Sequence, residues 1–274
     1  MSGRLVLAAT PIGDPSDAPP RLVRELATAQ VVAAEDTRRL RRLCQALDVE
    51  PAGQILSYHE HNEVARTEEL TQRVAQGDTV LIVTDAGMPS ISDPGFRVVT
   101  ACAEADLTVT CIPGPSAVLT ALAVSGLPVD RFCFEGFLPR KPGERRRVLT
   151  DVVDEPRTMV FFESPHRIAD TLATMAEVLG EDRRAAVCRE LTKTYEQVKR
   201  GGLAHLADWA APGVRGEITI VVAGAPRNVD PEQAVARVLD LTEGGTRLKD
   251  ACRIVRAETG IPTKQLYEAA LSKR

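Results

Sequence analysis

Three segments rich in glycine, proline and small polar residues have the composition of ligand-binding loops. Each follows a short apolar run, and they span Thr10–Asp14, Asp85–Gly95 and Ile112–Ala117. Proline fixes φ and glycine permits φ > 0, so the backbone of such a loop can lie against a flat ligand. Thr10–Asp14 is not a GxGxxG motif and no Walker lysine follows it, so phosphate binding is not indicated there. Taken alone, Thr10–Asp14 fits a simple tight turn equally well, and Ser116 also fits a helix N-cap.

The elements that must position these loops alternate between short apolar strands and longer helices. Continuously apolar strands in this alternation predict a parallel sheet with helices packed on it. Ligands of such sheets bind beyond the carboxyl ends of the strands, where the three loops begin. The expected strands are Leu5–Ala9, Val31–Ala34, Ile55–Ser57, Thr79–Val83 and Thr108–Ile112, and the expected helices are Arg21–Thr28, Arg38–Leu47, Val64–Ala75 and Phe96–Glu104.

A second α/β block and a helical tail follow. In the tail, three short helices joined by tight glycine turns fit a helix-turn-helix and equally any small three-helix cap. Gly224–Asn228 has the composition of a linker, and Gly260 is expected to end a helix. We predict domains over residues 1–115, 116–225 and 226–274. The expected strands of the second block are Arg131–Glu135, Thr158–Phe162, Ala185–Arg189 and Glu217–Val222, its helices are Ala117–Ser125, Glu144–Val152, Pro165–Leu179 and Leu203–Trp209, and those of the tail are Pro231–Leu241, Arg247–Thr259 and Thr263–Leu271.

The composition is that of a globular protein with about two domains in its 274 residues. No apolar run approaches the ~18 residues of a membrane span, and the first is too short for a signal peptide, so we expect a cytoplasmic protein without a membrane partner. The six cysteines include no CxxC pair, and His59-Glu60-His61 has no evident third ligand, so no metal site is expected.

The net charge of −4 argues against a uniformly basic nucleic-acid binder, but the basic residues are unevenly placed. Such clusters often cover solvated helix faces, yet their position beside the site loops favours an anionic partner. One cluster contains Arg38, Arg39, Arg41 and Arg42, and the other contains Arg140, Lys141, Arg145, Arg146 and Arg147.

Nine motifs in one order over nearly the whole chain make a resemblance specific. They are TPIGD, AAEDTRR, SYHEHNE, VTDAGMPSISDPG, IPGPSA, GFLPRK, FFESPHR, RELTKTYEQ and GEITIVVAG. Together they resemble the 16S rRNA (cytidine 2'-O) methyltransferases of the tetrapyrrole-methylase-type superfamily, and the tail is similar to that family's helix-turn-helix appendix. The resemblance implies an α/β fold with an N-terminal parallel sheet, a C-terminal mixed sheet, a cofactor cleft between the two domains and a small three-helix module.

The resemblance also implies S-adenosylmethionine as cofactor, 16S rRNA or the 30S subunit as partner and a homodimer. The expected product is a decoding-centre cytidine, cytidine 1402, methylated on its ribose 2'-oxygen. The residues that match the family's cofactor site are Pro11, Ile12, Gly13, Asp85, Ala86, Gly87, Ser90, Ile91, Ser116, Ala117, Phe162, Glu163, Leu191, Glu217, Ile218 and Thr219.

A weakly acidic ribose hydroxyl would benefit from a general base near the methyl donor. The sequence offers Glu35-Asp36, Glu163 and His166, and we favour Glu163 over Asp36 because it follows a strand whose end should face the cleft. Each carboxylate also fits an ordinary helix-terminal charge or salt bridge, and proton transfer to solvent remains an alternative. The residues expected to contact RNA phosphates are Arg38, Arg140, Lys141 and Arg167.

Two other functions fit parts of the sequence. A tetrapyrrole or precorrin C-methyltransferase would share the cofactor and the fold, but it needs neither the arginine clusters nor the helical tail. A helix-turn-helix DNA-binding regulator would use the tail, but it leaves two α/β domains with site-like loops without a catalytic role.

Overall fold

The computed structural model describes residues 3–225, 230–259 and 261–273. It contains two compact units, one of Met1–Val153 with Arg157–Ala223 and the other of Asp154–Pro156 with Gly224–Arg274. We call them the α/β body and the helical tail. Pro226, Arg227 and Asn228 of the expected linker, the expected helix stop at Gly260 and the terminal Arg274 lie outside the described residues. The domain limits at residues 115 and 225 stay predictions.

The N-terminal sheet of the body is wholly parallel, as its apolar strands predict. Its order is β3-β2-β4-β1-β5, and all four pairings are parallel. All five strands therefore end at the same edge of the sheet. The bounds are β1 Arg4–Ala8, β2 Val31–Ala34, β3 Gln54–Ser57, β4 Thr79–Val83 and β5 Thr108–Ile112.

Helices cover both faces of this sheet, because alternate side chains of each strand point to opposite faces. In β1, Leu5 and Leu7 pack with α3 (Glu63–Ala75) and α4 (Phe96–Glu104). The intervening Val6 and Ala8 pack with α1 (Pro20–Leu26) and α2 (Thr37–Ala46). Burial on both faces explains why the strands are apolar throughout.

The C-terminal sheet is mixed, which confirms the expected fold class. Its order is β6-β7-β10-β8-β9, with β6 and β7 parallel and the other pairings antiparallel. β9 was not expected, since Gln-Val-Lys-Arg-Gly-Gly is polar and forms an edge that needs burial on neither face. The bounds are β6 Phe132–Phe137, β7 Thr158–Glu163, β8 Arg184–Arg189, β9 Gln197–Gly202 and β10 Ile218–Val222.

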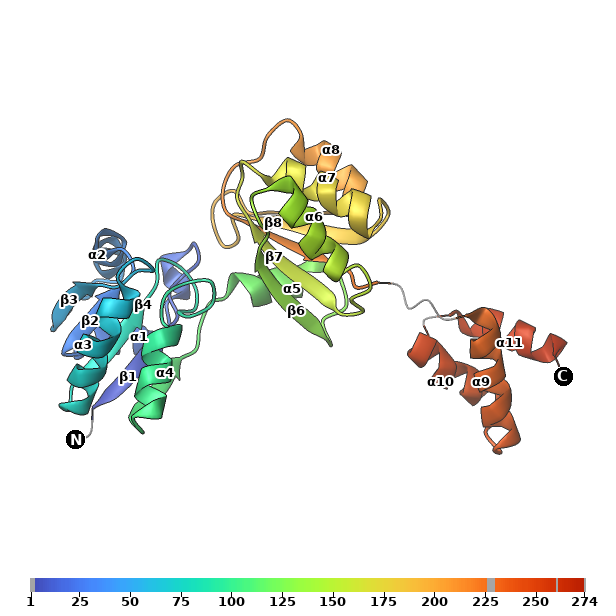
Figure 1. Ribbon diagram of the computed structural model, residues 1–274, viewed down its shortest axis with the longest axis horizontal. Coiled ribbons are helices and arrows are strands. Elements are labelled where there is room, and N and C mark those ends of the chain that lie inside the picture. Colours follow the sequence, from blue (N-terminus) through green and yellow to red (C-terminus); the bar gives the residue numbers. More distant parts are fainter. Residues whose placement is uncertain (1–2, 226–229, 260, 274) are drawn as a thin grey trace. The chain divides into compact units, whose positions relative to one another are not determined.

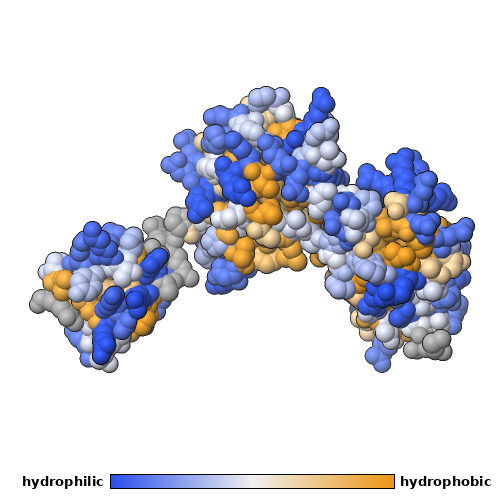
Figure 2. Space-filling view, turned by 180° about the vertical axis from the view of Figure 1, so that it is seen from behind, coloured by the Kyte–Doolittle hydropathy of each residue, from blue (hydrophilic) through white to orange (hydrophobic). Residues whose placement is uncertain are grey.

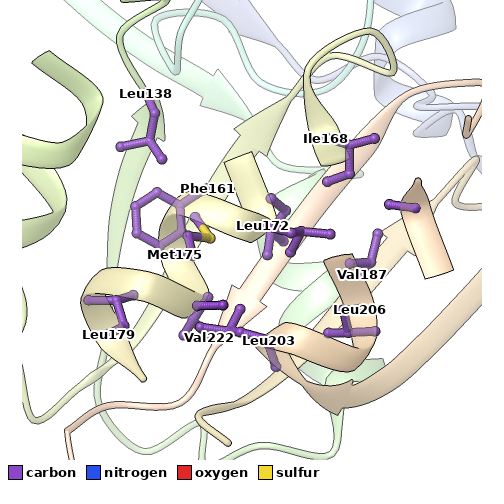
Figure 3. Close-up of a cluster of buried hydrophobic side chains, with 14 of the residues drawn as sticks. Leu138, Phe161, Ile168, Leu172, Met175, Leu179, Val187, Leu203, Leu206 and Val222 are labelled. Carbon is purple, nitrogen blue, oxygen red and sulfur yellow. The ribbon is translucent and has the colours of Figure 1, made fainter. Parts of the chain in front are cut away.

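The helices of this half also lie on both faces of their sheet. α6 (Pro142–Asp151), α7 (Ile168–Leu179) and α8 (Leu203–Ala210) lie together on one face (Figure 1). There Phe161, Leu172 and Leu206 belong to one buried apolar cluster (Figure 3). On the other face, α5 (Ala117–Ser125) buries Ala121 and Leu122 against Val160 and Val221.

The tail has an apolar core of its own. It consists of α9 (Pro231–Glu243), α10 (Leu248–Thr259) and α11 (Thr263–Ser272). Val238, Cys252, Val255 and Leu266 are buried among the three helices. The sequence predicted all three helices within a few residues. Among the described residues, no helix is both long enough and apolar enough to cross a bilayer.

Candidate active site

A cavity of about 400 Å³ is lined by loops from both sheets of the α/β body. This volume falls in the range of small-molecule sites. The lining residues from the first half are Ile12, Glu35, Arg39, Asp85, Ala86, Gly87, Met88, Ile91, Ser92, Asp93, Ser116, Ala117 and Val118, and those from the second half are Phe137, Phe162, Glu163, Ser164, Pro165, Cys188, Leu191, Gly216, Glu217, Ile218 and Thr219.

The first wall consists of loops at the carboxyl ends of parallel strands. The loop after β1 and the loop after β4 are joined by a reciprocal backbone pair, in which Thr10 N–H donates to Gly87 O (2.9 Å) and Gly87 N–H donates to Thr10 O (3.1 Å). Gly87 has φ of 78°, a left-handed conformation that glycine adopts without steric cost. This pairing fixes both loops before any ligand arrives.

The long loop after β4 is braced from outside the cavity by the SYHEHNE motif. Glu63 accepts hydrogen bonds from the Tyr58 hydroxyl and from Gly95 N–H, each at 3.0 Å. Ser90 and Ser92 have φ of 71° and 64°, unusual for residues with a side chain. The motif that invites a metal interpretation thus contributes a structural support for a strained loop.

The second wall depends on the antiparallel direction of β10. Because β10 runs against β7 and β8, its start pairs with their ends, and Ile218 lies opposite both Glu163 and Arg189. Phe162 at the end of β7 contacts the rings of Phe134 and Phe137, with centroid separations of 4.8 and 5.5 Å. The result is an apolar, aromatic wall facing the polar loops of the first half.

Comparison with known proteins identifies the family. A sequence model of the tetrapyrrole (corrin/porphyrin) methylases matches residues 4–207. The whole chain is 54% identical to a Mycobacterium tuberculosis protein named ribosomal RNA small subunit methyltransferase I, and the match covers 96% of that protein. The chain belongs to the ribosomal RNA small subunit methyltransferase I family. A Pseudomonas aeruginosa member is 42% identical over all of this chain and 98% of its own length.

Solved structures share the fold of this methyltransferase I family member at low identity. The uroporphyrin-III C-methyltransferase of Thermus thermophilus aligns with a TM-score of 0.57 and 21% identity over 81% of this chain and 95% of its own. Diphthine synthase aligns with a TM-score of 0.58 and 14% identity over 80% of this chain and 89% of its own. Methyltransferases of the tetrapyrrole methylase family use S-adenosylmethionine, which confirms the cofactor expected from the motifs.

Most residues that the resemblance predicts to bind the cofactor line the cavity. The exceptions are Pro11, Gly13 and Ser90, which are absent from its lining. A Cβ on Gly13 would lie 2.5 Å from the Thr192 hydroxyl oxygen, so this glycine allows close packing of two loops. Those that do line it are Ile12, Asp85, Ala86, Gly87, Ile91, Ser116, Ala117, Phe162, Glu163, Leu191, Glu217, Ile218 and Thr219.

Sequence reasoning missed several members of the lining. Asp93 lies in the same loop as Asp85 but was not singled out within it. Phe137, two residues beyond the expected strand Arg131–Glu135, and Cys188, within the expected strand Ala185–Arg189, gave no chemical signal. Glu35 was considered only as a base, and Arg39 only as part of a charge cluster. In the structure, the Arg39 guanidinium lies 3.3 Å from an Asp85 carboxylate oxygen. The other lining residues that were missed are Met88, Ser92, Val118, Ser164, Pro165 and Gly216.

The carboxylate favoured as a base, Glu163, already has protein partners. Its side chain is 1% exposed, and its two oxygens accept hydrogen bonds from Ser164 N–H and the Thr171 hydroxyl, both at 2.7 Å. The Arg167 guanidinium lies 3.3 Å from the same oxygen that Thr171 contacts. A carboxylate engaged in this way is a poor acceptor for a substrate proton. The base role of Glu163 stays a prediction that its geometry disfavours.

The second candidate base, Asp36, does not line the cavity. Its side chain caps α2 by accepting a hydrogen bond from Arg38 N–H at 2.8 Å, and it forms an ion pair with the Arg38 guanidinium. The hydrogen bonds and charge of Arg38 lower the pKa of Asp36 below its usual range. His166 is also absent from the lining, whereas Glu35 is present and accepts a hydrogen bond from Asp85 N–H at 3.1 Å.

The side chains expected to contact RNA differ in their exposure and in their ion pairs. Arg38 is 82% exposed on its side chain, although it pairs with Asp36. Arg140 is exposed, and Lys141 is exposed beside Glu144 at 3.0 Å. Arg167 instead donates to Leu138 O at 2.7 Å and holds Glu163, so it ties the GFLPRK loop to the end of β7. Contact of these residues with RNA stays a prediction.

The contacts of Glu163 predict a stability effect. Changing Glu163 to Gln should lower the free energy of unfolding by roughly 1.5–3 kcal/mol, the range for hydrogen bonds to a charged group, because the Arg167 guanidinium loses its ion pair with this carboxylate. Glu217→Gln is the matched control, since Glu217 pairs with Lys193 through a side chain that is 65% exposed and should contribute under about 1 kcal/mol. Urea denaturation of both variants measures the difference, and equal losses would contradict the structural role of Glu163.

Proposed function

We propose that the chain transfers a methyl group from S-adenosylmethionine to the ribose 2'-oxygen of a decoding-centre cytidine in 16S rRNA. The observation that carries the proposal is a cavity built by the family's own motifs in a chain 54% identical, over its full length, to a small-subunit rRNA methyltransferase. The bound cofactor would supply an activated methyl group on a positively charged sulfonium. Positioning of the acceptor then supplies much of the rate.

The character of the lining fits this cofactor. Its apolar floor contains Ile12, Val118 and Leu191, which suit an adenine ring and an aliphatic chain. Three carboxylates, Glu35, Asp85 and Asp93, stand on one wall, so the cavity favours a cationic ligand. The start of α5 at Ser116 and Ala117 offers backbone N–H groups for an anionic end such as a carboxylate. The chain's own role is to hold and orient the donor and to exclude water.

The specific rRNA substrate rests on two further supports. Relatives that match the whole chain are named for the small ribosomal subunit, and the solved tetrapyrrole methylases resemble it only in fold. The chain also has a helical tail that the family model for tetrapyrrole methylases, ending at residue 207, does not include. These observations favour an RNA substrate over a tetrapyrrole. They also favour an enzyme over a DNA-binding regulator.

The tail presents a basic face suited to RNA phosphates. Lys249, Arg253 and Arg256 are exposed on α10 at positions i, i+4 and i+7, which places them on one side of the helix. We propose that this face contacts the ribosomal substrate, with the assembled 30S subunit as the preferred form. Phosphate contacts of this kind position an enzyme without reading sequence.

A homodimer and a cytoplasmic location complete the proposal. Figure 2 shows apolar side chains reaching the surface of the α/β body. Leu119, Val129 and Phe132 are close in the chain and are 57%, 54% and 38% exposed. We propose a second copy of the chain as the partner that covers these exposed apolar side chains. An enzyme acting on ribosomal subunits works in the cytoplasm.

Loss of the gene should remove one modification from the small subunit. Primer extension at low nucleotide concentration, on 16S rRNA from a deletion strain, should lose the stop that a 2'-O-methyl group causes at cytidine 1402. Expression of the wild-type chain should restore the stop. An unchanged modification pattern in the deletion strain would refute the proposed substrate.

Product binding tests the cavity directly. S-adenosylhomocysteine should raise the melting temperature of the wild-type protein, because a ligand that binds only the folded state stabilises it. Gly87→Val should abolish the shift, since Gly87 lines the cavity and a β-branched residue cannot adopt φ of 78° there without strain. Gly143→Val is the control, because a Cβ there meets nothing within 4 Å. Equal shifts in all three proteins would place the cofactor elsewhere, and no shift in the wild type would contradict cofactor binding.

Charge removal tests the tail without deleting it. The triple change of Lys249, Arg253 and Arg256 to Ala should weaken binding to 30S subunits. The slope of the logarithm of the binding constant against the logarithm of the salt concentration should also become shallower, by about one for each lost phosphate contact. Affinity for S-adenosylhomocysteine should not change. A chain ending at Gly224 should behave similarly if the α/β body folds alone. Unchanged subunit affinity in the triple variant would assign the tail a purely structural role.

A further inference from the structure

The carboxylates that line the cavity differ in what they contact. Glu35 accepts a hydrogen bond from Asp85 N–H, and Asp85 pairs with Arg39 at 3.3 Å. Glu163 is held by Ser164, Thr171 and Arg167, and Glu217 lies 3.1 Å from the Lys193 ammonium. All five carboxylates of the lining lie within the described residues 3–225. Of these five, Asp93 is the one whose carboxylate has neither a hydrogen-bond donor nor an ion-pair partner.

The backbone holds Asp93 in a defined place despite its unpartnered side chain. It lies between Ser92, whose φ is 64°, and Pro94, whose ring restricts the preceding residue. Pro94 O accepts from Ser90 N–H at 3.3 Å, and Gly95 N–H donates to Glu63 Oε1 at 3.0 Å. These bonds fix the loop on both sides of Asp93. Its carboxylate is therefore presented to the cavity by a rigid segment.

The charges around Asp93 favour its protonated form. Glu35 comes from the end of β2 and Asp85 from the end of β4, and both repel a negative charge at Asp93. Arg39 of α2 is the cation of this wall, and it pairs with Asp85. Burial, and then repulsion by Glu35 and Asp85, raises the pKa of Asp93 to about 7. A base is most efficient when its pKa lies near the working pH.

We propose that Asp93 is the general base that accepts the proton of the ribose 2'-hydroxyl during methyl transfer. This assignment rests on the proposed function. The hydroxyl proton moves to a carboxylate oxygen of Asp93 while the hydroxyl oxygen bonds the methyl carbon. The sulfur–methyl bond breaks, its electron pair stays on sulfur, and the donor leaves as a neutral thioether. Asp93 then releases the proton to solvent and is ready for another turnover.

The same comparison explains why the two carboxylates favoured by sequence are worse bases. Glu163 would have to give up Arg167 and Thr171 before it could accept a proton. Asp36 lies outside the lining and its ion pair with Arg38 keeps it ionised. Asp93 needs no rearrangement, because a substrate hydroxyl would be its first hydrogen-bond donor.

The kinetic test compares isosteric variants on 30S subunits under single-turnover conditions. Asp93→Asn should slow methyl transfer by about 10²–10⁴-fold, the range for loss of a general base, while the melting shift with S-adenosylhomocysteine persists. The wild-type rate should rise with pH and level off above about 7, and the variant should lose this rise. Asp93→Glu should recover part of the rate. Asp208→Asn, an exposed aspartate on α8, is the control and should keep the wild-type rate and pH profile.

A second readout does not involve catalysis. A carboxyl whose pKa is raised from 3.8 to about 7 by folding stabilises the folded state most below pH 3.8, and that contribution is lost as pH rises through 7. The wild-type melting temperature should therefore fall relative to that of Asp93→Asn between pH 5 and pH 8. Identical pH dependence of the two proteins would overturn the environment assigned to Asp93.

The outcomes separate this inference from the function on which it rests. A wild-type protein that methylates the 2'-oxygen, with Asp93→Asn within a few-fold of its rate, would refute only the role of Asp93. Loss of the S-adenosylhomocysteine shift in Asp93→Asn would make Asp93 a cofactor-binding residue and would also overturn the proposal. A wild-type protein without 2'-O-methyl transfer would refute the function and the base together.

Discussion

The direction of the strands is the constraint from which the site follows. Five parallel strands bring every loop of the N-terminal sheet that carries a motif to one edge. In the C-terminal sheet, β10 runs against its neighbours, so a strand start joins the ends of β7 and β8 at the cavity. Strand direction alone therefore brings loops that are far apart in the sequence together at the cavity. The reciprocal hydrogen bonds between Thr10 and Gly87 then fix two of these loops against each other.

Charge is distributed within this frame in an ordered way. Most carboxylates of the lining have a neighbouring cation or accept hydrogen bonds from the backbone. The remaining negative charge of the cavity therefore lies on the few carboxylates of one wall. A negative wall opposite an aromatic and aliphatic one attracts a cation that also has a large apolar surface. Burial raises the pKa values of Glu35 and Asp85, so the ionised forms of these two carboxylates are less favourable than they would be in water. Perturbed pKa values of this kind concentrate at functional sites.

The sequence predicted the fold well because the fold depends on local patterns. Apolar strands between helical patterns predicted the parallel sheet, and glycine-rich and proline-rich loops marked the ends of β1, β4 and β5. The edge strand β9 was missed because its polar residues show no strand pattern. The partners of Glu163 were also invisible, since Thr171 and Arg167 reach it only after α7 packs on the sheet. Local composition marked loops that line the cavity, whereas the contacts of a carboxylate depend on long-range packing.

β10 separates the cavity lining from the point at which the chain continues into the helical tail. The strand begins in the cavity lining at Ile218 and ends at Val222, on the opposite edge of its sheet, before the chain enters the helical tail. Ala225 N–H donates to Glu155 O at 2.6 Å, a contact within the unit formed by Asp154–Pro156 and Gly224–Arg274. An appendage joined at the edge away from the cavity can be gained, lost or exchanged without altering a single lining residue. The lining and the appendage can therefore vary independently of each other, and solved structures that share the fold align with about four-fifths of this chain.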